Sequence, residues 1–273
     1  MKRKIISWNC QGINAKKLNL QNIILETQPD IICLQEVQIN PNDILPNFKG
    51  YQSYFNCKPT VTRAHGGTGL LIKPDIPQSA INITSGLQVT SVKVTIEHTI
   101  SICSIYISEA DWRSTNPIEI KNLIQNIPHP KIVTGDWNAR NRLWHSDSNC
   151  YKGETLEKIF DELNMVVIDE NSPTHISTAH NSCSHIDVTI VSPSLKIKTT
   201  WATLDDTFNS DHYPIILEIE TENTPSYRRP RWNFKEANWT KYQAELNITI
   251  PQHIDNIPNL VNTVTEKIIA AAK

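Results

Sequence analysis

The stretch Ile132-Val133-Thr134-Gly135-Asp136-Trp137-Asn138 constrains the fold of this chain more than any other. Two β-branched apolar residues and a threonine are typical of the end of a buried strand, and Gly135 permits a tight turn directly after it. In an extended backbone, Asp136 and Asn138 project to the same side. A carboxylate beside an amide can hold a proton, a water or a metal ion. An ordinary strand-ending turn explains the same residues, so other parts of the chain must decide.

Size and charge fit a globular protein and do not by themselves indicate a nucleic-acid binder. The chain has 273 residues, 39% hydrophobic and 20% charged, with a formal net charge of -2. This length can bury one large core or two small ones. Bulk charge does not describe a local cleft, so nucleic-acid binding stays open. The N-terminus has no apolar run of the signal-peptide kind, and no stretch is long enough to span a membrane. We therefore expect a protein that is not secreted.

The six cysteines indicate a reduced, intracellular protein rather than a disulfide framework. None forms a Cys-x-x-Cys pair, and several lie in apolar, strand-like runs. The alternative to weigh is a zinc site built from His175, His180, Cys183 and His185. Their spacing does not match the paired pattern of structural zinc sites, and they lie in a turn rich in Ser, Thr and Asn. We do not predict zinc from this spacing.

The chain up to about residue 220 mixes strands, helices and hairpins. Apolar spacing predicts helices over Leu18–Glu26, Asn116–Ile127 and Glu154–Leu163, the last directly after Gly153. Apolar runs predict strands over Lys4–Ser7, Asp30–Glu36, Tyr51–Phe55, Leu70–Ile72, Met165–Ile168, Ile186–Val191 and Pro214–Ile219, and a hairpin over Gln88–Ile96 and Ile100–Ile107. This order indicates mixed rather than purely parallel sheets. The run Gly66-Gly67-Thr68-Gly69 is a weak phosphate-loop candidate, because it opens a strand rather than a helix.

Composition changes at Thr221–Pro225. The next run, Tyr227–Trp232, is basic with aromatic residues and prolines, and indicates an extended linker. A helix-like segment follows over Pro258–Lys273. We expect one domain over residues 1–222 and a linker with a helical segment over residues 223–273. Because the chain ends inside a helical pattern, we expect it to be a piece of a longer protein.

Polar residues cluster where the predicted strands begin or end. Strand ends on one rim of a sandwich can converge on one cleft. Each such residue has an ordinary structural explanation by itself, such as a turn or a surface carboxylate. The order in which they occur together favours a catalytic site. The candidates are Asn9, Glu36, Tyr106, Asp136, Asn138, Asp187, Asp211 and His212.

These residues lie in blocks that resemble the signature blocks of the endonuclease/exonuclease/phosphatase superfamily. The blocks are Trp8-Asn9-Cys10-Gln11-Gly12, Leu34-Gln35-Glu36, Gly135-Asp136-Trp137-Asn138, Ser184-x-Ile186-Asp187 and Ser210-Asp211-His212-x-Pro214. A closer resemblance is to the apurinic-like endonuclease domain of non-LTR (LINE-type) retrotransposons. It is carried by Asp136-Trp137-Asn138-Ala139-Arg140-Asn141-x-x-Trp144, by Ser172–His175 with Ser184–Thr189, and by Pro230-Arg231-Trp232-Asn233.

The resemblance implies an α/β fold, a four-layer sandwich of two mixed β-sheets flanked by helices. It implies hydrolysis of a phosphodiester that depends on a divalent metal, Mg²⁺ or Mn²⁺, and leaves a 3′ hydroxyl. By the resemblance, Glu36, Asn9 and Asp211 hold the metal ion, an oxygen set suited to Mg²⁺. Abasic endonucleases carry an acidic residue where this chain has Gln11, so a single metal ion is expected here.

The resemblance also assigns the groups that act on the phosphate and on protons. Asp136, fixed by Asn138, would position or deprotonate the attacking water, or protonate the leaving group. His212, paired with Asp187, and the Tyr106 hydroxyl would contact the scissile phosphate. The residues expected to bind phosphate or DNA around them are Thr174, Ser184, Ser210, Arg140, Asn141, Trp144, His180 and Asn181.

The leading hypothesis is a DNA endonuclease that nicks target DNA so that the 3′ hydroxyl primes reverse transcription. Its expected partners are double-stranded DNA and a reverse transcriptase domain of the same polyprotein, an RNA-directed DNA polymerase. We expect synthesis in the cytoplasm and action in the nucleus, without a membrane. The alternatives are a phosphatase of the same superfamily and a catalytically inactive DNA-binding module. The small polar loop from His175 to Cys183 is expected to carry target specificity, because it can enter a DNA groove.

Overall fold

The apolar strands pair into two six-stranded sheets in a computed structural model of the chain. It describes residues 2–40, 43–57, 64–177, 182–221, 238–246 and 257–271. The first sheet has the strand order β13-β14-β1-β2-β4-β3. Its strands are β1 (Lys2–Asn9), β2 (Ile31–Gln35), β3 (Gln52–Asn56), β4 (Thr68–Ile72), β13 (Thr199–Thr203) and β14 (Ile215–Glu220). β1 is parallel to β2, whereas its other neighbour β14 is antiparallel, so this sheet is mixed.

The second sheet has the order β5-β6-β7-β8-β12-β9 and is also mixed. Its strands are β5 (Gln78–Ala80), β6 (Gln88–Thr95), β7 (Thr99–Tyr106), β8 (Lys131–Asp136), β9 (Val166–Ile168) and β12 (Asp187–Val191). The hairpin expected over residues 88–107 is confirmed as β6 and β7. β7 and β8 are parallel, and β12 is antiparallel to β8. A separate two-stranded ribbon pairs β10 (His175–Ser177) with β11 (Ser182–Ser184).

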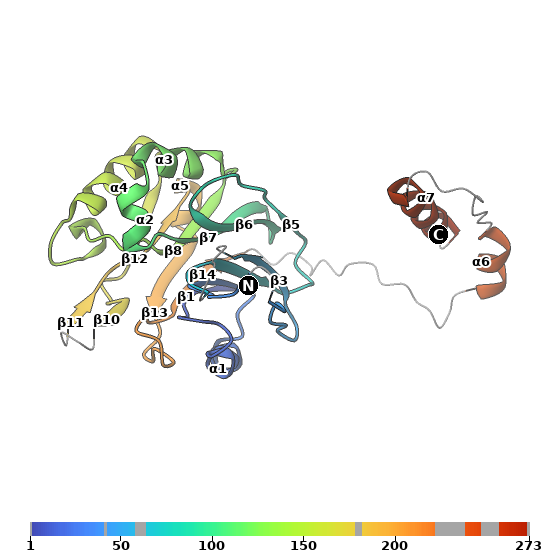
Figure 1. Cartoon of the computed structure of the whole chain (residues 1–273), viewed down its shortest axis with the longest axis horizontal. Helices are drawn as coiled ribbons and strands as arrows, with labels where there is room; N and C mark the ends of the chain where they lie inside the picture. Colours follow the sequence, from blue (N-terminus) through green and yellow to red (C-terminus); the bar gives the residue numbers. More distant parts are fainter. Residues whose placement is uncertain are drawn as a thin grey trace. The chain divides into compact units, whose positions relative to one another are not determined.

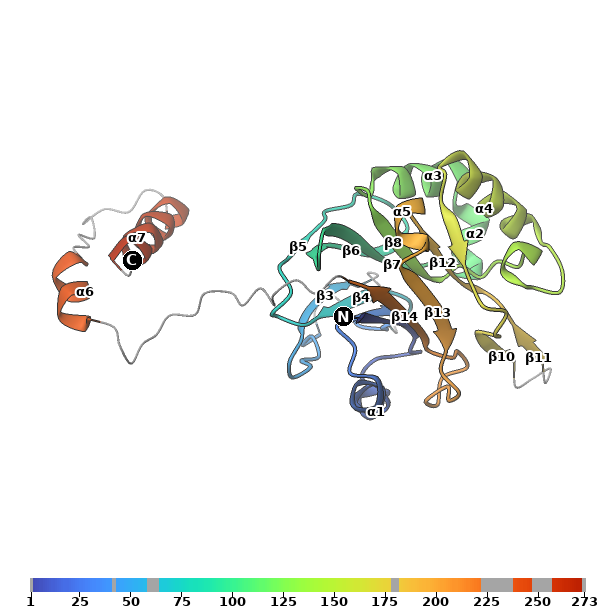
Figure 2. The same ribbon diagram turned by 180° about the vertical axis from the view of Figure 1, so that it is seen from behind.

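Helices cover the outer faces of the two sheets, which gives four layers (Figure 1). The helix α1 (Lys17–Thr27) packs on the first sheet. The second sheet is covered by α2 (Glu109–Ser114), α3 (Pro117–Asn126) and α4 (Tyr151–Glu162). The view from behind shows the same layers, with the short helix α5 (Pro193–Lys196) near the second sheet (Figure 2). The predicted four-layer α/β sandwich of two mixed sheets is confirmed.

Three apolar clusters hold the layers together, because side chains on a strand alternate between its faces. Ile5 of β1 and Ile132 of β8 belong to the cluster between the sheets. Ile6, next to Ile5, belongs to the cluster under α1. Val133, next to Ile132, belongs to the cluster under α3 and α4. Both sheets are therefore buried on both faces, which explains why their central strands are continuous apolar runs.

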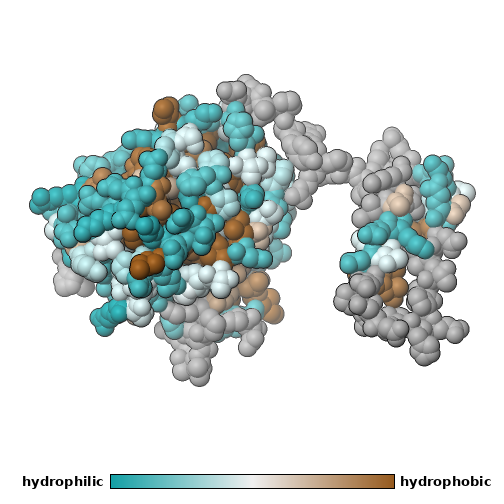
Figure 3. All heavy atoms as spheres, turned by 90° about the horizontal axis from the view of Figure 1, so that it is seen from above, coloured by the Kyte–Doolittle hydropathy of each residue, from teal (hydrophilic) through white to brown (hydrophobic). Residues whose placement is uncertain are grey.

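The described residues group into two compact units, one within residues 1–227 and one within 228–273. The second unit contains α6 (Trp239–Glu245) and α7 (Ile257–Ala271). The described residues include no helix that is long and apolar enough to cross a membrane. The face seen in Figure 3 is mostly hydrophilic, with hydrophobic side chains in small groups.

Gly153 lies inside α4, so the expectation that this glycine precedes the helix is wrong. The helix begins at Tyr151, and Gly153 is buried in its first turn. A Cβ atom at this position would lie 2.0 Å from the carbonyl oxygen of Arg140. Only glycine allows the helix to approach the chain this closely, directly after the Asp136–Asn138 turn. The glycine at position 153 therefore does not mark the start of the helix. It is needed because α4 packs closely against the backbone of Arg140.

We predict that Gly153→Ala destabilises the protein by about 3 kcal/mol or more, because the backbone oxygen of Arg140 cannot move away cheaply. Helix propensity alone predicts the opposite, a stabilisation of about 1 kcal/mol. Thermal or urea unfolding measures the difference. Lys158→Ala, on an exposed position of the same helix, is the control and should change stability by less than about 0.5 kcal/mol. A Gly153→Ala protein as stable as the wild type would contradict the packing argument.

Candidate active site

Strand register places the candidate residues in two facing rows. In the second sheet, Tyr106 at the end of β7 and Asp187 at the start of β12 are both paired with Asp136 at the end of β8. In the first sheet, Asn9 at the end of β1 is paired with Gln35, which ends β2 directly before Glu36. The two rows lie at the same end of the sandwich. Residues far apart in sequence therefore converge there, as the strand-end argument predicts.

The Asn9 amide joins the two rows. It is fully buried, and its Nδ2 donates to Glu36 Oε1 and to Asp136 Oδ2, both at 3.0 Å. The same nitrogen lies 3.4 Å from His212 Nε2. Asn9 Oδ1 accepts a bond from the Gln11 backbone N–H at 3.3 Å. One neutral side chain thus holds two carboxylates, one from each sheet, without adding charge.

Asp136 is held by amides on several sides. It is 1% exposed, and it accepts bonds from the Asn138 backbone N–H at 2.9 Å and from Asn138 Nδ2 at 3.0 Å. The backbone does not stay extended here, because Asn138 has a left-handed conformation with φ +47°. The turn brings the Asn138 amide back onto Asp136 instead. Burial raises the pKa of Asp136 to about 8, although the charge of His212 opposes this effect. Such a value suits proton transfer near neutral pH.

His212 and Asp187 form a buried ion pair. His212 Nδ1 lies 2.8 Å from Asp187 Oδ2, and both side chains are at least 95% buried. The His212 Nε2 atom faces the cleft, 3.9 Å from Asp136 Oδ2. Burial by itself lowers the pKa of His212, but Asp187, Asp136 and Asp211 outweigh it and raise the pKa to about 10. The imidazole is therefore a cation that can face a phosphate oxygen.

Tyr106 and Glu36 lie beside each other at the ends of β7 and β2. Tyr106 is 9% exposed. Burial, the charges of Glu36 and Asp136, and a hydrogen bond with Glu36 raise the pKa of Tyr106 far above its usual value. The hydroxyl therefore stays protonated and is a donor. Glu36 Oε2 also accepts a bond from Gln38 Nε2 at 3.2 Å, a contact that the sequence did not indicate.

The glycine run before β4 supports the turn that carries Glu36. The Gly66 carbonyl accepts from the Gln38 N–H at 2.8 Å, and the Gly67 carbonyl accepts from the Val37 N–H at 3.3 Å. A Cβ atom at Gly67 would lie 2.9 Å from Val37 Cγ2. These glycines let two loops approach closely, so the run positions Glu36 instead of forming a phosphate loop.

Three hydroxyl residues are expected near the phosphate. In the structure their side chains form hydrogen bonds with protein groups. Thr174 is 1% exposed, and its Oγ1 accepts the backbone N–H groups of Ile186 and Asp187. Ser210 Oγ donates to the Asn9 carbonyl at 2.7 Å and accepts the His212 N–H at 3.2 Å. Ser184 Oγ lies 2.9 Å from His175 Nδ1. Thr174 and Ser210 therefore position Asp187 and His212.

Asn141 and Trp144, expected to bind DNA, are buried at 2% and 1% exposure, so that expectation is wrong for their side chains. Asn141 Oδ1 accepts the Leu143 N–H at 2.8 Å and caps the 3-10 turn Arg142–Trp144. Trp144 packs in the core beneath the second sheet's helices. Arg140 is exposed and stays available. His180 and Asn181 lie outside the described residues.

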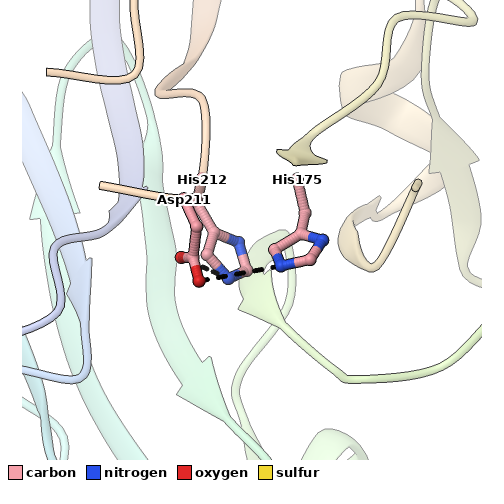
Figure 4. Close-up of side chains that lie close together, drawn as sticks. All are labelled: His175, Asp211 and His212. Atoms are coloured by element: carbon pink, nitrogen blue, oxygen red, sulfur yellow. Dashed lines mark ion pairs between the residues drawn. The ribbon is translucent and has the colours of Figure 1, made fainter. Parts of the chain in front are cut away.

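The Asp211 carboxylate contacts two imidazoles, those of His175 and His212. His212 Nε2 is 3.5 Å from Asp211 Oδ1, and His175 Nε2 is 3.7 Å from Asp211 Oδ2 (Figure 4). In the sequence, His175 falls into one cluster with Cys183 and His185. On the ribbon, however, His175 is paired with Ser184, so the side chain of the next residue, His185, points to the opposite face of the ribbon. The His185 ring lies beside His145. Strand alternation therefore separates the sequence cluster and brings His175 to the catalytic end.

The oxygen donors of the site fit a hard divalent cation. Glu36 offers a carboxylate that is bonded only to neutral side chains among the contacts described above. Asp211 Oδ1 is buried and has no hydrogen-bond donor among the described residues. In the described part of the chain, Asn9 Oδ1 accepts only the 3.3 Å bond from the Gln11 backbone N–H. A carboxylate and amide set of this kind suits Mg²⁺ or a similar ion.

Comparison with known proteins agrees with this geometry. A model of the Endonuclease/Exonuclease/phosphatase family matches residues 6–212. A probable RNA-directed DNA polymerase from transposon BS of Drosophila melanogaster is 26% identical over 98% of this chain. The corresponding X-element protein from the same organism is 21% identical over 100% of it. The chain spans only 30% and 31% of the length of these relatives.

Solved structures share the fold. The endonuclease domain of TRAS1, a telomere-specific non-LTR retrotransposon, superposes with a TM-score of 0.67 at 18% identity, covering 80% of this chain and 98% of that one. AP endonuclease LMAP from Leishmania major superposes with a TM-score of 0.66 at 16% identity, covering 81% and 88%. The family match runs from β1 to His212 and so includes both rows of the site. The chain belongs to the endonuclease/exonuclease/phosphatase family, whose members generally use divalent metal ions.

Proposed function

We propose that residues 1–222 are a DNA endonuclease domain that nicks target DNA for a non-LTR retrotransposon. The nick leaves a 3′ hydroxyl, which primes a reverse transcriptase domain of the same polyprotein in the nucleus. The observation that carries the proposal is the Asn9 amide, which joins Glu36 of one sheet to Asp136 of the other. The relatives named as transposon RNA-directed DNA polymerases support the retrotransposon context. Residues 223–273 would be the linker and helical segment that follow.

The Glu36 and Asp211 carboxylates and the side-chain oxygen Asn9 Oδ1 would hold Mg²⁺ or Mn²⁺. When bound, the ion would neutralise charge on the phosphate oxygens. The remaining groups belong to the chain itself. Asp136, with a pKa near neutrality and held by Asn9 and Asn138, would hold the attacking water or exchange a proton with it.

Two donors would face the charge that develops on the phosphate. His212 stays protonated because Asp187 holds its Nδ1, so Nε2–H would donate to a phosphate oxygen. The Tyr106 hydroxyl would be a second donor. Both are fixed by buried contacts before substrate arrives, and preorganised donors of this kind lower the energy of a charged transition state. The exposed Arg140 would hold a backbone phosphate and add affinity without sequence preference.

We predict that Glu36→Ala lowers nicking of supercoiled plasmid in Mg²⁺ by about 100-fold or more, because the main anionic metal ligand is lost. The contacts that Glu36 loses are with the neutral side chains Asn9, Gln38 and Tyr106, so no buried charge is left without its partner and the thermal unfolding midpoint should fall by a few degrees at most. Glu26→Ala, an exposed glutamate on α1, is the matched control and should nick like the wild type. Folded Glu36→Ala protein with full activity would sink the metal assignment.

We predict that Asp136→Asn and His212→Gln each lower kcat by about 10²–10⁴-fold, as expected for groups that transfer protons or stabilise charge in the transition state. Binding of a short DNA duplex should change little, because these interactions strengthen mainly in the transition state. Steady-state nicking and fluorescence anisotropy measure the two effects. The control is Asp75→Asn, at an exposed carboxylate outside the site. Equal losses of affinity and rate would identify them as binding residues instead.

A further inference from the structure

His175, Asp211 and His212 form a second cluster at the edge of the site. One ligand atom of each lies within 4.8 Å of the others. The two imidazole rings are 4.8 Å apart and meet edge to face, and His175 and His212 are joined by a β-bridge. Figure 4 marks the ion pairs that join the Asp211 carboxylate to the two imidazoles, with the His212 ring drawn between Asp211 and His175. Neither the family's oxygen set nor the proposed mechanism uses His175.

Both imidazoles have their other ring nitrogen fixed. His212 Nδ1 is 2.8 Å from Asp187 Oδ2, and His175 Nδ1 is 2.9 Å from Ser184 Oγ. An outer hydrogen bond of this kind orients a histidine ligand and leaves Nε2 free for a metal ion. The Asp187-His212 pair has the carboxylate–histidine arrangement that supports zinc ligands. Two prepared histidines therefore face one carboxylate.

The distances and charges suit a transition-metal ion. Ligand atoms around a tetrahedral zinc ion lie about 3.3 Å apart. His212 Nε2 lies 3.5 Å from Asp211 Oδ1 and His175 Nε2 lies 3.7 Å from Asp211 Oδ2, and one ligand atom of each of the three residues lies within 4.8 Å of the others. Asp211 Oδ1 is buried without a hydrogen-bond donor among the described residues. Binding would replace the proton on His212 Nε2. The carboxylates of Asp136, Asp187 and Asp211 around His212 attract a divalent cation more strongly than the single positive charge of a protonated imidazole.

We propose that His175, Asp211 and His212 bind a transition-metal ion of the Zn²⁺ class, with the fourth position open. This nitrogen-containing set differs in chemistry from the oxygen set of Glu36, Asn9 and Asp211, which prefers Mg²⁺. The bound ion is coordinated by His212 Nε2, the atom that would otherwise donate a hydrogen bond to the phosphate. Zn²⁺ therefore inhibits the nicking that Mg²⁺ supports, a consequence that rests on the proposed function.

Metal binding is tested first without DNA. The purified chain is titrated with CoCl₂ and followed by visible absorption, and with ZnCl₂ and followed by calorimetry. We expect one site with the d–d bands of four-coordinate Co²⁺. His175→Gln should weaken Zn²⁺ binding at least tenfold. His98→Gln, an exposed histidine in the β6–β7 turn, is the matched control and should bind like the wild type. Equal Zn²⁺ affinity in wild type and His175→Gln would overturn the proposal.

Two further measurements keep the result interpretable. Ser184→Ala leaves all three ligands but removes the partner of His175 Nδ1, and should weaken Zn²⁺ binding about tenfold. This variant decides the question if His175→Gln does not fold, and unchanged binding in it would then overturn the proposal. In the nicking assay with Mg²⁺, each variant is compared with its own rate without ZnCl₂, and His175→Gln should need at least tenfold more ZnCl₂ than the wild type for half-inhibition. If wild type binds Co²⁺ through His175 but never nicks DNA, the metal site stands and the proposed function fails.

Discussion

The buried amide of Asn9 is the contact on which the site depends. Two carboxylates from different sheets, Glu36 and Asp136, lie beside one nitrogen that donates to both. Burying like charges close together is costly unless hydrogen bonds or counter-charges offset it. An aspartate at this position would add a third negative charge, and an aliphatic residue would remove the one donor that the two carboxylates share. A neutral amide is the side chain that lets the two sheets close at this end while keeping an anionic, cation-attracting cleft.

The space between the sheets changes character along the strands toward that amide. On β1 the inward residues are Ile5, Ser7 and Asn9, and on β8 they are Ile132, Thr134 and Asp136. The middle level is polar but hydrogen-bonded: Gln35 Nε2 donates to Ser104 Oγ at 2.9 Å, and Thr134 and Thr189 share a bond at 2.8 Å. The apolar level holds the sheets together, the polar level is hydrogen-bonded except at Gln35 Oε1, which has no partner among the described residues, and the last level carries the chemistry. The period of two in each strand is what separates the inner, functional residues from the outer ones that bind helices.

Left-handed backbone conformations occur directly after the strands that carry the site. Gln11, Glu36, Gln38 and Asn138 all have left-handed backbones, with φ between +46° and +50°. Non-glycine residues rarely adopt this conformation, and it persists only where surrounding contacts enforce it. Here it turns the chain directly after β1, β2 and β8, so that side chains fold back over the strand ends. The glycine run beside β2 and Gly153 against Arg140 let the supporting segments approach closely enough to hold these turns.

The sequence by itself determined most of the strands, the longer helices and the identities of the strand-end residues, but not short strands such as β5 or the edge strand β13. Those features are local, because apolar periodicity and turn residues act over a few positions. It did not determine which polar residues face the cleft. Trp144 and Asn141 follow the Asp136 turn closely, yet packing buries both. His175 lies within ten residues of Cys183 and His185 in the sequence. The pairing of the ribbon and the bridge to His212 nevertheless place it at Asp211 and His212. Such choices depend on contacts between segments many residues apart, and only the closing of the two sheets brings those segments within bonding distance.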